Sequence, residues 1–231
     1  MNPDGVGRKA YGRVDVSHYR DLVAHGGLVN ALRVTAEEDR VDGMSIDAPY
    51  RGDDVGYTAA KIDTCRGRIL VHLGAEERCF LLNVHDENLW IAGGGTADLS
   101  SVLAVAVAWR DGISLESLES RFPFMRVSDL ARVLASPDPI SAQWNYLREA
   151  PVFHGDWYLV NAAFENPVLR SFFPDLSHGA LFLSRSWGDR RDAVKITPRS
   201  DGGYSVSRPS RFESLDEAII AAATLVVQIP E

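Results

Sequence analysis

Ser177 and His178 stand next to each other in a stretch rich in apolar and aromatic residues, and Asp175 precedes them by two positions. A histidine titrates near neutral pH, so His178 is the first candidate for acid or base chemistry. Three interpretations stay open: a nucleophilic triad of Ser177, His178 and Asp175, a lone histidine acting as general acid or base, and a structural turn that caps a strand. Neighbours on a turn seldom point at one another, and no Gly-x-Ser-x-Gly motif is present, so the pattern favours the structural turn.

Four further side chains belong to the candidate site. Arg185 could hold a carboxylate or stabilise an enolate because its guanidinium stays charged at any working pH, and the alternative is a solvated charge at a strand end. Tyr158 could supply a proton. Trp157 and Trp187 could line a groove for a peptide, although aromatic residues at helical spacing are more often core. We therefore predict catalytic roles for His178, Arg185 and Tyr158, and substrate contacts for Trp157, Trp187 and Ser177.

Residues that bind metals or phosphates do not occur with the spacing that such sites need. Cys65 and Cys79 stand in no Cys-x-x-Cys pattern, and His72 and His85 have no third ligand at a fixed spacing, so no metal site is expected. Gly93-Gly-Gly95 precedes a predicted helix but lacks the lysine of a P-loop and the full dinucleotide spacing. We therefore expect no cofactor.

Composition narrows the class of partner. The chain has 231 residues, 45% of them hydrophobic, which is enough for a full core. Its formal net charge is −8 and its basic residues are scattered, which argues against nucleic acid as a partner. No apolar run reaches membrane-spanning length, and the first residues lack the apolar segment of a signal peptide. We expect a cytoplasmic protein that does not enter a membrane.

The first half of the chain predicts a helix, a three-stranded sheet and a second helix. Apolar spacing predicts a helix from near Asp15, broken at Gly26-Gly27. Thr96 is expected to cap a buried helix from Leu99 to Trp109. The span from Gly43 to Arg68 is rich in Gly and charges and predicts a long irregular loop. Alternating apolar residues joined by short turns predict an antiparallel meander of Ile69–Leu73, Arg78–Val84 and Asn88–Ala92.

The second half predicts the same order of elements. A helix from Asp156 to Phe164 is broken at Asn166-Pro167 and ends before Pro174, so Asp175 to His178 are expected in a turn. A capping box, Ser214 to Glu217, opens the last helix. Three strands are predicted between these helices, at Ala180–Ser184, Ala193–Thr197 and Gly203–Ser207.

The predicted fold class is therefore α+β, with two copies of a helix, three-stranded antiparallel meander and helix unit that form a pseudo-duplication. Ser136-Pro-Asp-Pro139 marks the best boundary between them. The expected divisions are a flexible tail at 1–14, an N-terminal α+β unit at 15–135, a linker or helix at 136–150 and a C-terminal α+β unit at 151–231, which could also be fused into one domain.

Several of these segments resemble a known family. Phe172–Ser184, Asp201–Val206 and the helix start Ser214–Ala218 resemble the C-terminal half of the DUF6193 natural-product biosynthesis proteins. Gly93–Leu99 and Ala108–Gly112, with the Gly26-Gly-Leu28 element, resemble their N-terminal half. The resemblance implies a bacterial protein from natural-product gene clusters, often ones that encode modified ribosomal peptides. It supplies no agreed catalytic set.

Two functional hypotheses follow. In the first, the protein is a metal-free enzyme that acts on a precursor peptide, for instance a cyclase that adds a cysteine thiol to a dehydroamino acid and forms a thioether ring. His178, Arg185 and Tyr158 would then supply the base, the enolate donor and the proton source. In the second, the protein is a non-catalytic module that binds the peptide or a partner synthetase, presenting sheet edges to an extended chain.

Overall fold

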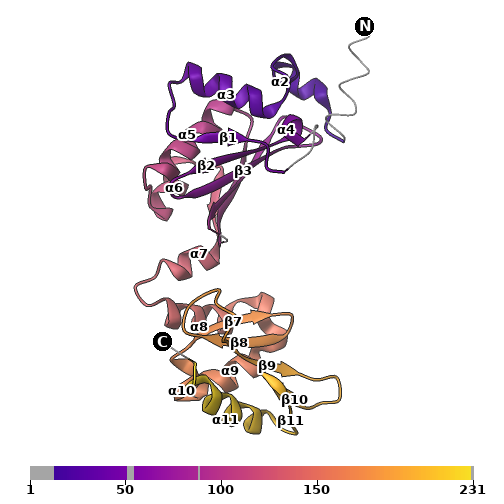
Figure 1. Cartoon of the computed structure of the whole chain (residues 1–231), viewed down its shortest axis with the longest axis vertical. Coiled ribbons are helices and arrows are strands. Elements are labelled where there is room, and N and C mark those ends of the chain that lie inside the picture. The colour runs from indigo at the N-terminus through magenta and orange to yellow at the C-terminus, as the bar shows by residue number, and fades with distance from the viewer. Residues whose placement is uncertain (1–12, 51–54, 88, 230–231) are drawn as a thin grey trace. The chain divides into compact units, whose positions relative to one another are not determined.

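The computed structural model describes residues 13–50, 55–87 and 89–229, and residues 1–12 of the predicted tail lie outside them. The chain divides into two compact units, Met1–Arg132 and Val133–Glu231. Each unit is an antiparallel sheet packed with helices (Figure 1), so the predicted α+β class is confirmed. Within the described residues, no helix is both long and apolar enough to cross a membrane.

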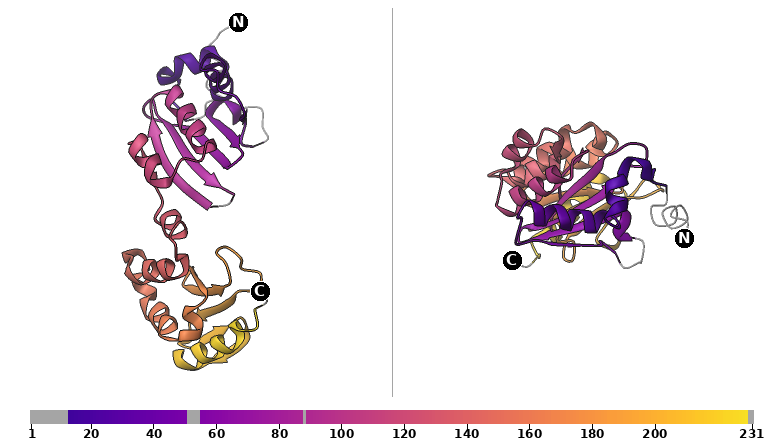
Figure 2. Two further views of the ribbon diagram at one scale, coloured as in Figure 1. Left: turned by 90° about the vertical axis from the view of Figure 1, so that its left-hand side faces the viewer. Right: turned by 90° about the horizontal axis from the view of Figure 1, so that it is seen from above.

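The described part of the N-terminal unit holds a six-stranded sheet in which every strand pairs with its neighbour in the sequence. Helices α3 (Leu28–Glu38) and α5 (Leu99–Arg110) lie on one face of this sheet (Figure 2). The strands are β1 (Ser45–Asp47), β2 (Ala59–Thr64), β3 (Gly67–Leu73), β4 (Phe80–Asp86), β5 (Leu89–Thr96) and β6 (Met125–Val127). The helices are η1 (Val16–Tyr19), α2 (Arg20–Ala24), α3 (Leu28–Glu38), α4 (Val55–Thr58), α5 (Leu99–Arg110) and α6 (Leu115–Arg121), and α7 (Asp129–Leu134) spans the boundary between the units.

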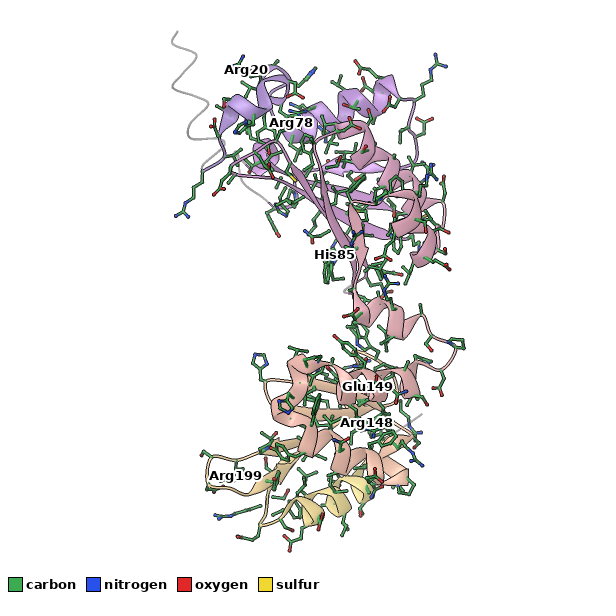
Figure 3. The ribbon with its side chains drawn as sticks, turned by 180° about the vertical axis from the view of Figure 1, so that it is seen from behind. Arg20, Arg78, His85, Arg148, Glu149 and Arg199 are labelled. Atoms are coloured by element: carbon green, nitrogen blue, oxygen red, sulfur yellow. The ribbon has the colours of Figure 1, made fainter. Side chains whose placement is uncertain are left out.

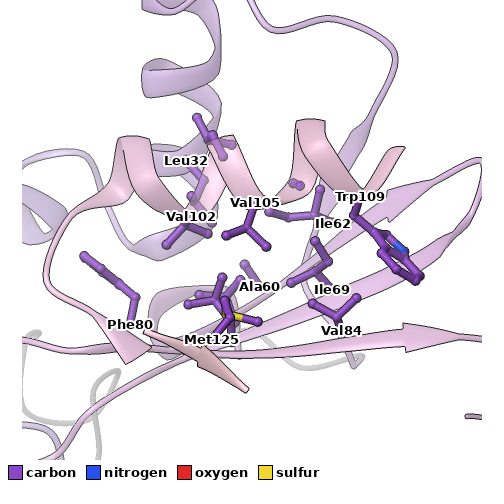
Figure 4. Close-up of a cluster of buried hydrophobic side chains, with 14 of the residues drawn as sticks. Leu32, Ala60, Ile62, Ile69, Phe80, Val84, Val102, Val105, Trp109 and Met125 are labelled. Carbon is purple, nitrogen blue, oxygen red and sulfur yellow. The ribbon is translucent and has the colours of Figure 1, made fainter. Parts of the chain in front are cut away.

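Strand register brings apolar side chains into rows on the face that the helices cover. Ile62 of β2 lies opposite Ile69 of β3, which lies opposite Val84 of β4. Val102 and Val105 of α5 pack onto this face (Figure 4), and all five side chains are buried. Full burial of such a side chain stabilises the fold by about 1.5–3 kcal/mol, so the rows hold α5 against the sheet. The predicted burial of this helix is confirmed.

Tyr19 anchors the first helices to the sheet. Its buried phenol oxygen accepts a hydrogen bond from the Cys79 N–H (3.0 Å) and lies within hydrogen-bonding distance of the Gly74 (3.0 Å), Glu77 (2.9 Å) and Cys79 (3.1 Å) carbonyl oxygens. Arg78 adds a two-pronged ion pair with Asp21 of α2, both contacts measuring 2.8 Å. The turn between β3 and β4 is thereby fixed to the N-terminal helices.

The C-terminal unit has the same type of architecture. In its described part, five strands form an antiparallel sheet in sequential order, and α8 and α11 pack against it. The strands are β7 (Phe173–Ser177), β8 (Ala180–Ser184), β9 (Val194–Pro198), β10 (Tyr204–Val206) and β11 (Arg208–Phe212). The helices are α8 (Pro139–Glu149), η2 (Pro151–Asp156), α9 (Trp157–Glu165), α10 (Pro167–Arg170) and α11 (Leu215–Val226), the last opened by the predicted capping box at Ser214.

Side chains of α8 connect the helices of this unit. The buried Trp144 indole N–H lies 3.0 Å from the Arg170 carbonyl oxygen and 3.2 Å from that of Phe172, so it bonds α8 to the segment that leads into β7. Arg148, labelled in Figure 3, donates to Asn161 of α9 (2.9 Å) and stacks on the Phe164 ring at 4.0 Å. These contacts hold α8 and α9 together beside the sheet.

Three sequence predictions about local structure are wrong. Phe173–Ser177 is not the end of a helix and a turn but the edge strand β7, because a proline such as Pro174 is tolerated where no outer strand needs its N–H. The Gly43–Arg68 span is not an irregular loop, since β1, α4 and β2 fall within it, residues 51–54 being outside the described part. The cap of α5 is Asp98, which accepts from the Ser101 N–H at 2.9 Å, and Thr96 belongs to β5.

The predicted meanders correspond to β3–β5 and β8–β10. Both sheets contain more strands than the three predicted, because β1, β2 and β6 extend the first sheet and β7 and β11 extend the second. The duplication of one ancestral unit stays a prediction.

Candidate functional site

Ser177 and His178 belong to the hairpin that joins β7 to β8. Ser177 pairs with Ala180, so the turn consists of two residues, His178 and Gly179. Both have positive φ angles, 52° and 72°, which is the signature of a type I′ turn. Glycine adopts this conformation without strain and histidine does not, so the fold holds His178 in its position. The predicted role as a strand-capping turn matches this geometry.

The nucleophilic triad does not form. Ser177 Oγ lies 3.1 Å from His178 Nδ1, and His178 is exposed. The Asp175 carboxylate is engaged by Arg190, whose Nε donates to it at 2.8 Å. A triad needs the carboxylate to orient the imidazole, and here it is bound to a guanidinium instead.

Two residues that the sequence did not suggest lie at the same end of the sheet as this turn. Asp156 Oδ1 lies 3.7 Å from the point that a Cβ would occupy at Gly179, so the last residue of η2 reaches the turn. The Tyr204 phenol lies near that of Tyr158, close enough to affect its pKa. Tyr204 lies opposite Pro198 in the sheet, at the same end as the turn.

We call the residues at this end of the sheet the turn cluster: Asp156, Tyr158, Ser177, His178 and Tyr204. Ser177 contacts His178, Asp156 approaches the turn at Gly179, and Tyr158 lies near Asp156 and Tyr204. Burial, the nearby Tyr204 and the charge of Asp156 raise the pKa of Tyr158. Its side chain is still 47% exposed. The phenol therefore stays protonated at neutral pH, and it is a hydrogen-bonding group rather than a base.

Trp157 adjoins the turn cluster but is packed. Its ring meets that of His154 edge to face, with centroids 4.5 Å apart. The residue is half-buried, and its Nε1 atom is buried without a hydrogen-bond partner in the described part of the chain. Trp157 therefore acts mainly as a packing residue beside the turn cluster and offers little of its side chain to a ligand.

Arg185 and Trp187 lie at the other end of β8. The five residues of that strand span about 16 Å, so they separate Arg185 from His178 by more than either side chain can bridge. The Arg185 guanidinium stacks on the Phe172 ring at 4.8 Å and donates to the Ile229 carbonyl oxygen at 3.2 Å. Arg185 lines a cavity of about 220 Å³ together with Ser184, Ser186, Asp189, Asp192, Ala193 and Ile229.

The predicted site residues therefore fall into two groups. Tyr158, Ser177, His178 and the neighbouring Trp157 lie toward the same end of the sheet, whereas Arg185 and Trp187 lie at the other end of β8. Asp156 and Tyr204 were missed because they come from η2 and β10, and no local pattern links those segments. Among the described residues, no three His, Cys, Asp or Glu side chains gather closely enough to hold a metal ion.

The sheet edges are poorly suited to bind an added strand. In the described part of the chain the edges are β1 and β6 in one sheet and β7 and β11 in the other. β1 and β6 have three residues each, and β7 and β11 contain Pro174 and Pro209. Short edge strands and prolines hinder the pairing of a sheet edge with an added strand. A ligand is therefore expected to bind side chains rather than a sheet edge.

Comparison with known proteins finds one family model that matches the region of the turn cluster. Residues 138–231 match the model of DUF6193, a family of unknown function. No curated protein and no solved structure matches the chain. The match includes all of η2 to α11, and hence every residue of the turn cluster, while the six-stranded sheet lies outside it.

Proposed function

We propose that this protein, whose residues 138–231 match the model of the DUF6193 family, binds a precursor peptide in natural-product biosynthesis, in the cytoplasm, as a non-catalytic module. The resemblance of both halves of the chain to natural-product biosynthesis proteins supports the context. The peptide would come from the same gene cluster.

The separation of His178 from Arg185 is the observation that carries the non-catalytic role. A thiol addition needs a base at the sulfur and a donor at the developing enolate within a few ångströms of each other. About 16 Å of strand lies between the two residues that were predicted for those tasks. Tyr158, whose pKa is raised, does not replace either of them.

The turn cluster supplies groups that suit a peptide. The carboxylate of Asp156 accepts hydrogen bonds, and the phenols of Tyr158 and Tyr204 both donate and accept. Amphipathic aromatic side chains of this kind are enriched in protein interfaces. Such a surface binds backbone amides and basic side chains, which agrees with the acidic net charge of −8.

A cyclase remains the second candidate because Ser177 and His178 are in contact. In that reaction the imidazole would take the proton of a cysteine S–H, the sulfur would add to the carbon–carbon double bond of a dehydroamino acid, and a proton would return to the α-carbon. No net oxidation occurs, so neither an oxidant nor a reductant is required.

One experiment separates the two candidates. The purified protein is mixed with the precursor peptide encoded beside its gene, dehydrated where the cluster provides the enzymes, and binding, mass and free thiol are followed. We expect saturable binding at constant thiol content. Loss of thiol at constant mass, faster than without protein and abolished by His178→Ala, would show catalysis instead.

The variants locate the binding surface. Tyr158→Ala is expected to weaken binding about tenfold, because truncation of an interface tyrosine commonly costs 1 kcal/mol or more. Tyr50→Ala is the matched control, since Tyr50 is 64% exposed and lies in the other unit. Equal loss in both variants, or no binding by the wild type, would contradict the proposal.

A further inference from the structure

The six-stranded sheet has one face that no helix covers in the described structure. The helices pack on the face that carries the buried rows, and the alternate residues of each strand point the other way. Across the centre of this open face, Leu70 lies opposite Asn83, which lies opposite Gly93, which lies opposite Arg126. In the next row Arg68 lies opposite His85, and His85, which is labelled in Figure 3, lies opposite Trp90.

A β-bulge places Trp90 on the open face. Val84 pairs with Ala92, but the next residue, His85, pairs with Trp90, so Ile91 is an extra residue in β5. Ile91 and Ala92 are both buried, although consecutive residues of a regular strand face opposite sides. Regular alternation from Ala92 would turn Trp90 inward, so the bulge directs its indole to solvent.

The indole of Trp90 packs over Gly93, which has no side chain to displace it. A Cβ at Gly93 would lie only 3.0 Å from Trp90 Cζ2, so the ring passes over the bare backbone of that residue. Leu81 is arranged in the same way, with its Cδ2 3.6 Å from the Cβ position of Gly95. Trp90 is 47% exposed and Leu81 is 45% exposed. We call these four residues the Trp90 platform.

Charges of both signs lie near the platform, and the two that no described carboxylate pairs with are positive, although Arg126 Nη1 donates to the carbonyl oxygens of Pro123 and Met125 at 2.8 Å. Arg68 and Arg126 have no ion-pair partner among the described residues, and the Glu119 carboxylate near Arg126 is held by Arg132 and by the Val127 N–H. Asp63, which lies opposite Arg68, is paired with Lys61.

Burial and the charge of Arg68 lower the pKa of His85, so His85 is neutral at pH 7. Among the described residues, Arg68 and Arg126 therefore supply the unpaired positive charge beside the platform, on a chain whose net charge is −8.

We propose that the Trp90 platform binds an acidic peptide segment that carries an aromatic side chain. The aromatic ring stacks on the exposed side of the Trp90 indole, and carboxylates meet Arg68 and Arg126. β3 and β6 lie three strand spacings, about 14 Å, apart. Acidic residues two positions before and after an aromatic residue lie about 13 Å apart in an extended chain, which matches that width.

The small number of unpaired cations among the described residues of the open face favours a peptide over single-stranded nucleic acid. Nucleic acid brings one phosphate per nucleotide and binds along a continuous series of cations. The open face offers two arginines without ion-pair partners in the described residues, and Asp47 and Asp63 border them at β1 and β2. This second binding surface lies outside the family match and does not depend on the function proposed for the turn cluster.

The test uses the full-length protein with its five tryptophans labelled at the indole nitrogen and observed by NMR. Trp90→Leu identifies the Trp90 signal, and the signal of the buried Trp109 reports whether the fold is intact. The probe is acetyl-Glu-Ser-Phe-Ser-Glu-amide. We expect the Trp90 signal to shift in a saturable manner while the Trp109 signal stays in place.

Matched peptides and protein variants test which groups of the peptide and of the Trp90 platform are needed for binding. Alanine in place of phenylalanine, or glutamine in place of both glutamates, is expected to weaken binding about tenfold. Arg126→Gln should weaken binding and reduce its dependence on salt. Gly93→Ala keeps every charge but displaces the indole, so it should weaken binding several-fold. If it disturbs the Trp109 signal, Trp90→Leu decides the same point, with binding followed by the NMR signals of the peptide's own phenylalanine.

Three results would overturn the proposal. They are an unmoved Trp90 signal at millimolar peptide, equal shifts with the alanine peptide, and tighter binding of an eight-residue oligothymidylate than of the acidic peptide. The last result would assign the platform to single-stranded nucleic acid.

Discussion

Replacement of Tyr19 by phenylalanine removes one oxygen atom from the centre of the N-terminal unit. That oxygen accepts the Cys79 N–H at 3.0 Å and lies 2.9 to 3.1 Å from the carbonyl oxygens of Gly74, Glu77 and Cys79. The ring itself packs against Phe80 and would stay in place. The perturbation is therefore limited to hydrogen bonding.

The loss of unfolding free energy in Tyr19→Phe can be worked out from the backbone groups that the substitution leaves without a hydrogen bond. The phenol O–H can donate to one carbonyl at a time, so the substitution costs one donated and one accepted hydrogen bond. An unsatisfied buried group costs about 1–3 kcal/mol, so an N–H and a carbonyl together give a loss of about 3 kcal/mol. The Cys79 carbonyl retains its bond from the Gly74 N–H at 2.7 Å, which limits the loss.

Urea denaturation of the full chain, with tryptophan and amide-exchange readouts for each unit, measures this loss. A slope of about 2 kcal/mol per molar predicts a midpoint about 1.5 M lower for the N-terminal unit and no change for the C-terminal unit. Tyr50→Phe, at a side chain that is 64% exposed, is the control and should change stability by less than about 0.5 kcal/mol. A midpoint shift for Tyr19→Phe as small as that of the control would refute the hydrogen-bond reasoning.

Alkaline pH gives an independent check. Burial raises the pKa of Tyr19, so its contribution is complete below the ordinary tyrosine value, about 10, and decreases as the pH rises through the folded value. The phenylalanine variant should lose less stability than the wild type above about pH 10.

Three further outcomes are expected. Trp144→Phe should destabilise the C-terminal unit by about 2 kcal/mol, because the indole N–H serves the carbonyls of Arg170 and Phe172, and an unchanged urea midpoint would contradict this. Hydrogen bonds from the Ser101 hydroxyl and from the backbone N–H groups of Ser100 and Ser101 lower the pKa of Asp98. The stability that this carboxylate provides is therefore present above about pH 4 and is lost as the pH falls. Between about pH 3 and 7 the thermal midpoint of Asp98→Asn should depend less on pH than that of the wild type. His178→Val should lower the thermal midpoint of the C-terminal unit, since a β-branched residue at φ 52° is strained by about 1 kcal/mol, whereas His178→Asn should not.

Local signals predicted much of the fold. The Ser214 capping box, the Gly26-Gly27 break and the apolar helix after Asp98 depend on residues within one or two turns, so the sequence alone located them. β2 was missed because Ala-Ala-Lys-Ile-Asp-Thr has little strand propensity of its own. It is a strand because β1 and β3 pair with its two sides, which is information from distant residues.

Only part of the candidate site could be predicted, because local sequence signals do not show which distant segments meet. Ser177 and His178 are neighbours in sequence, and their contact could be anticipated. Their distance from Arg185 depends on β8 being an extended strand between them, and the apolar run Ala180–Ser184 already indicated that strand. Asp156 and Tyr204 come to this end of the sheet only through the folding of η2 and β10, and the Ile91 bulge that exposes Trp90 depends on pairing with β4.

The strictly sequential order of the strands bears on how the chain folds. In both sheets every strand pairs with its neighbour in the sequence, so in the described structure no pairing has to wait for a distant strand. Folding is faster when contacts join nearby residues, because little chain entropy is lost in closing short loops. The N-terminal unit, which ends near Arg132, can therefore complete its sheet while the ribosome is still synthesising the C-terminal unit. Each unit then has only its own strands to select from, which reduces the chance of mispairing during synthesis.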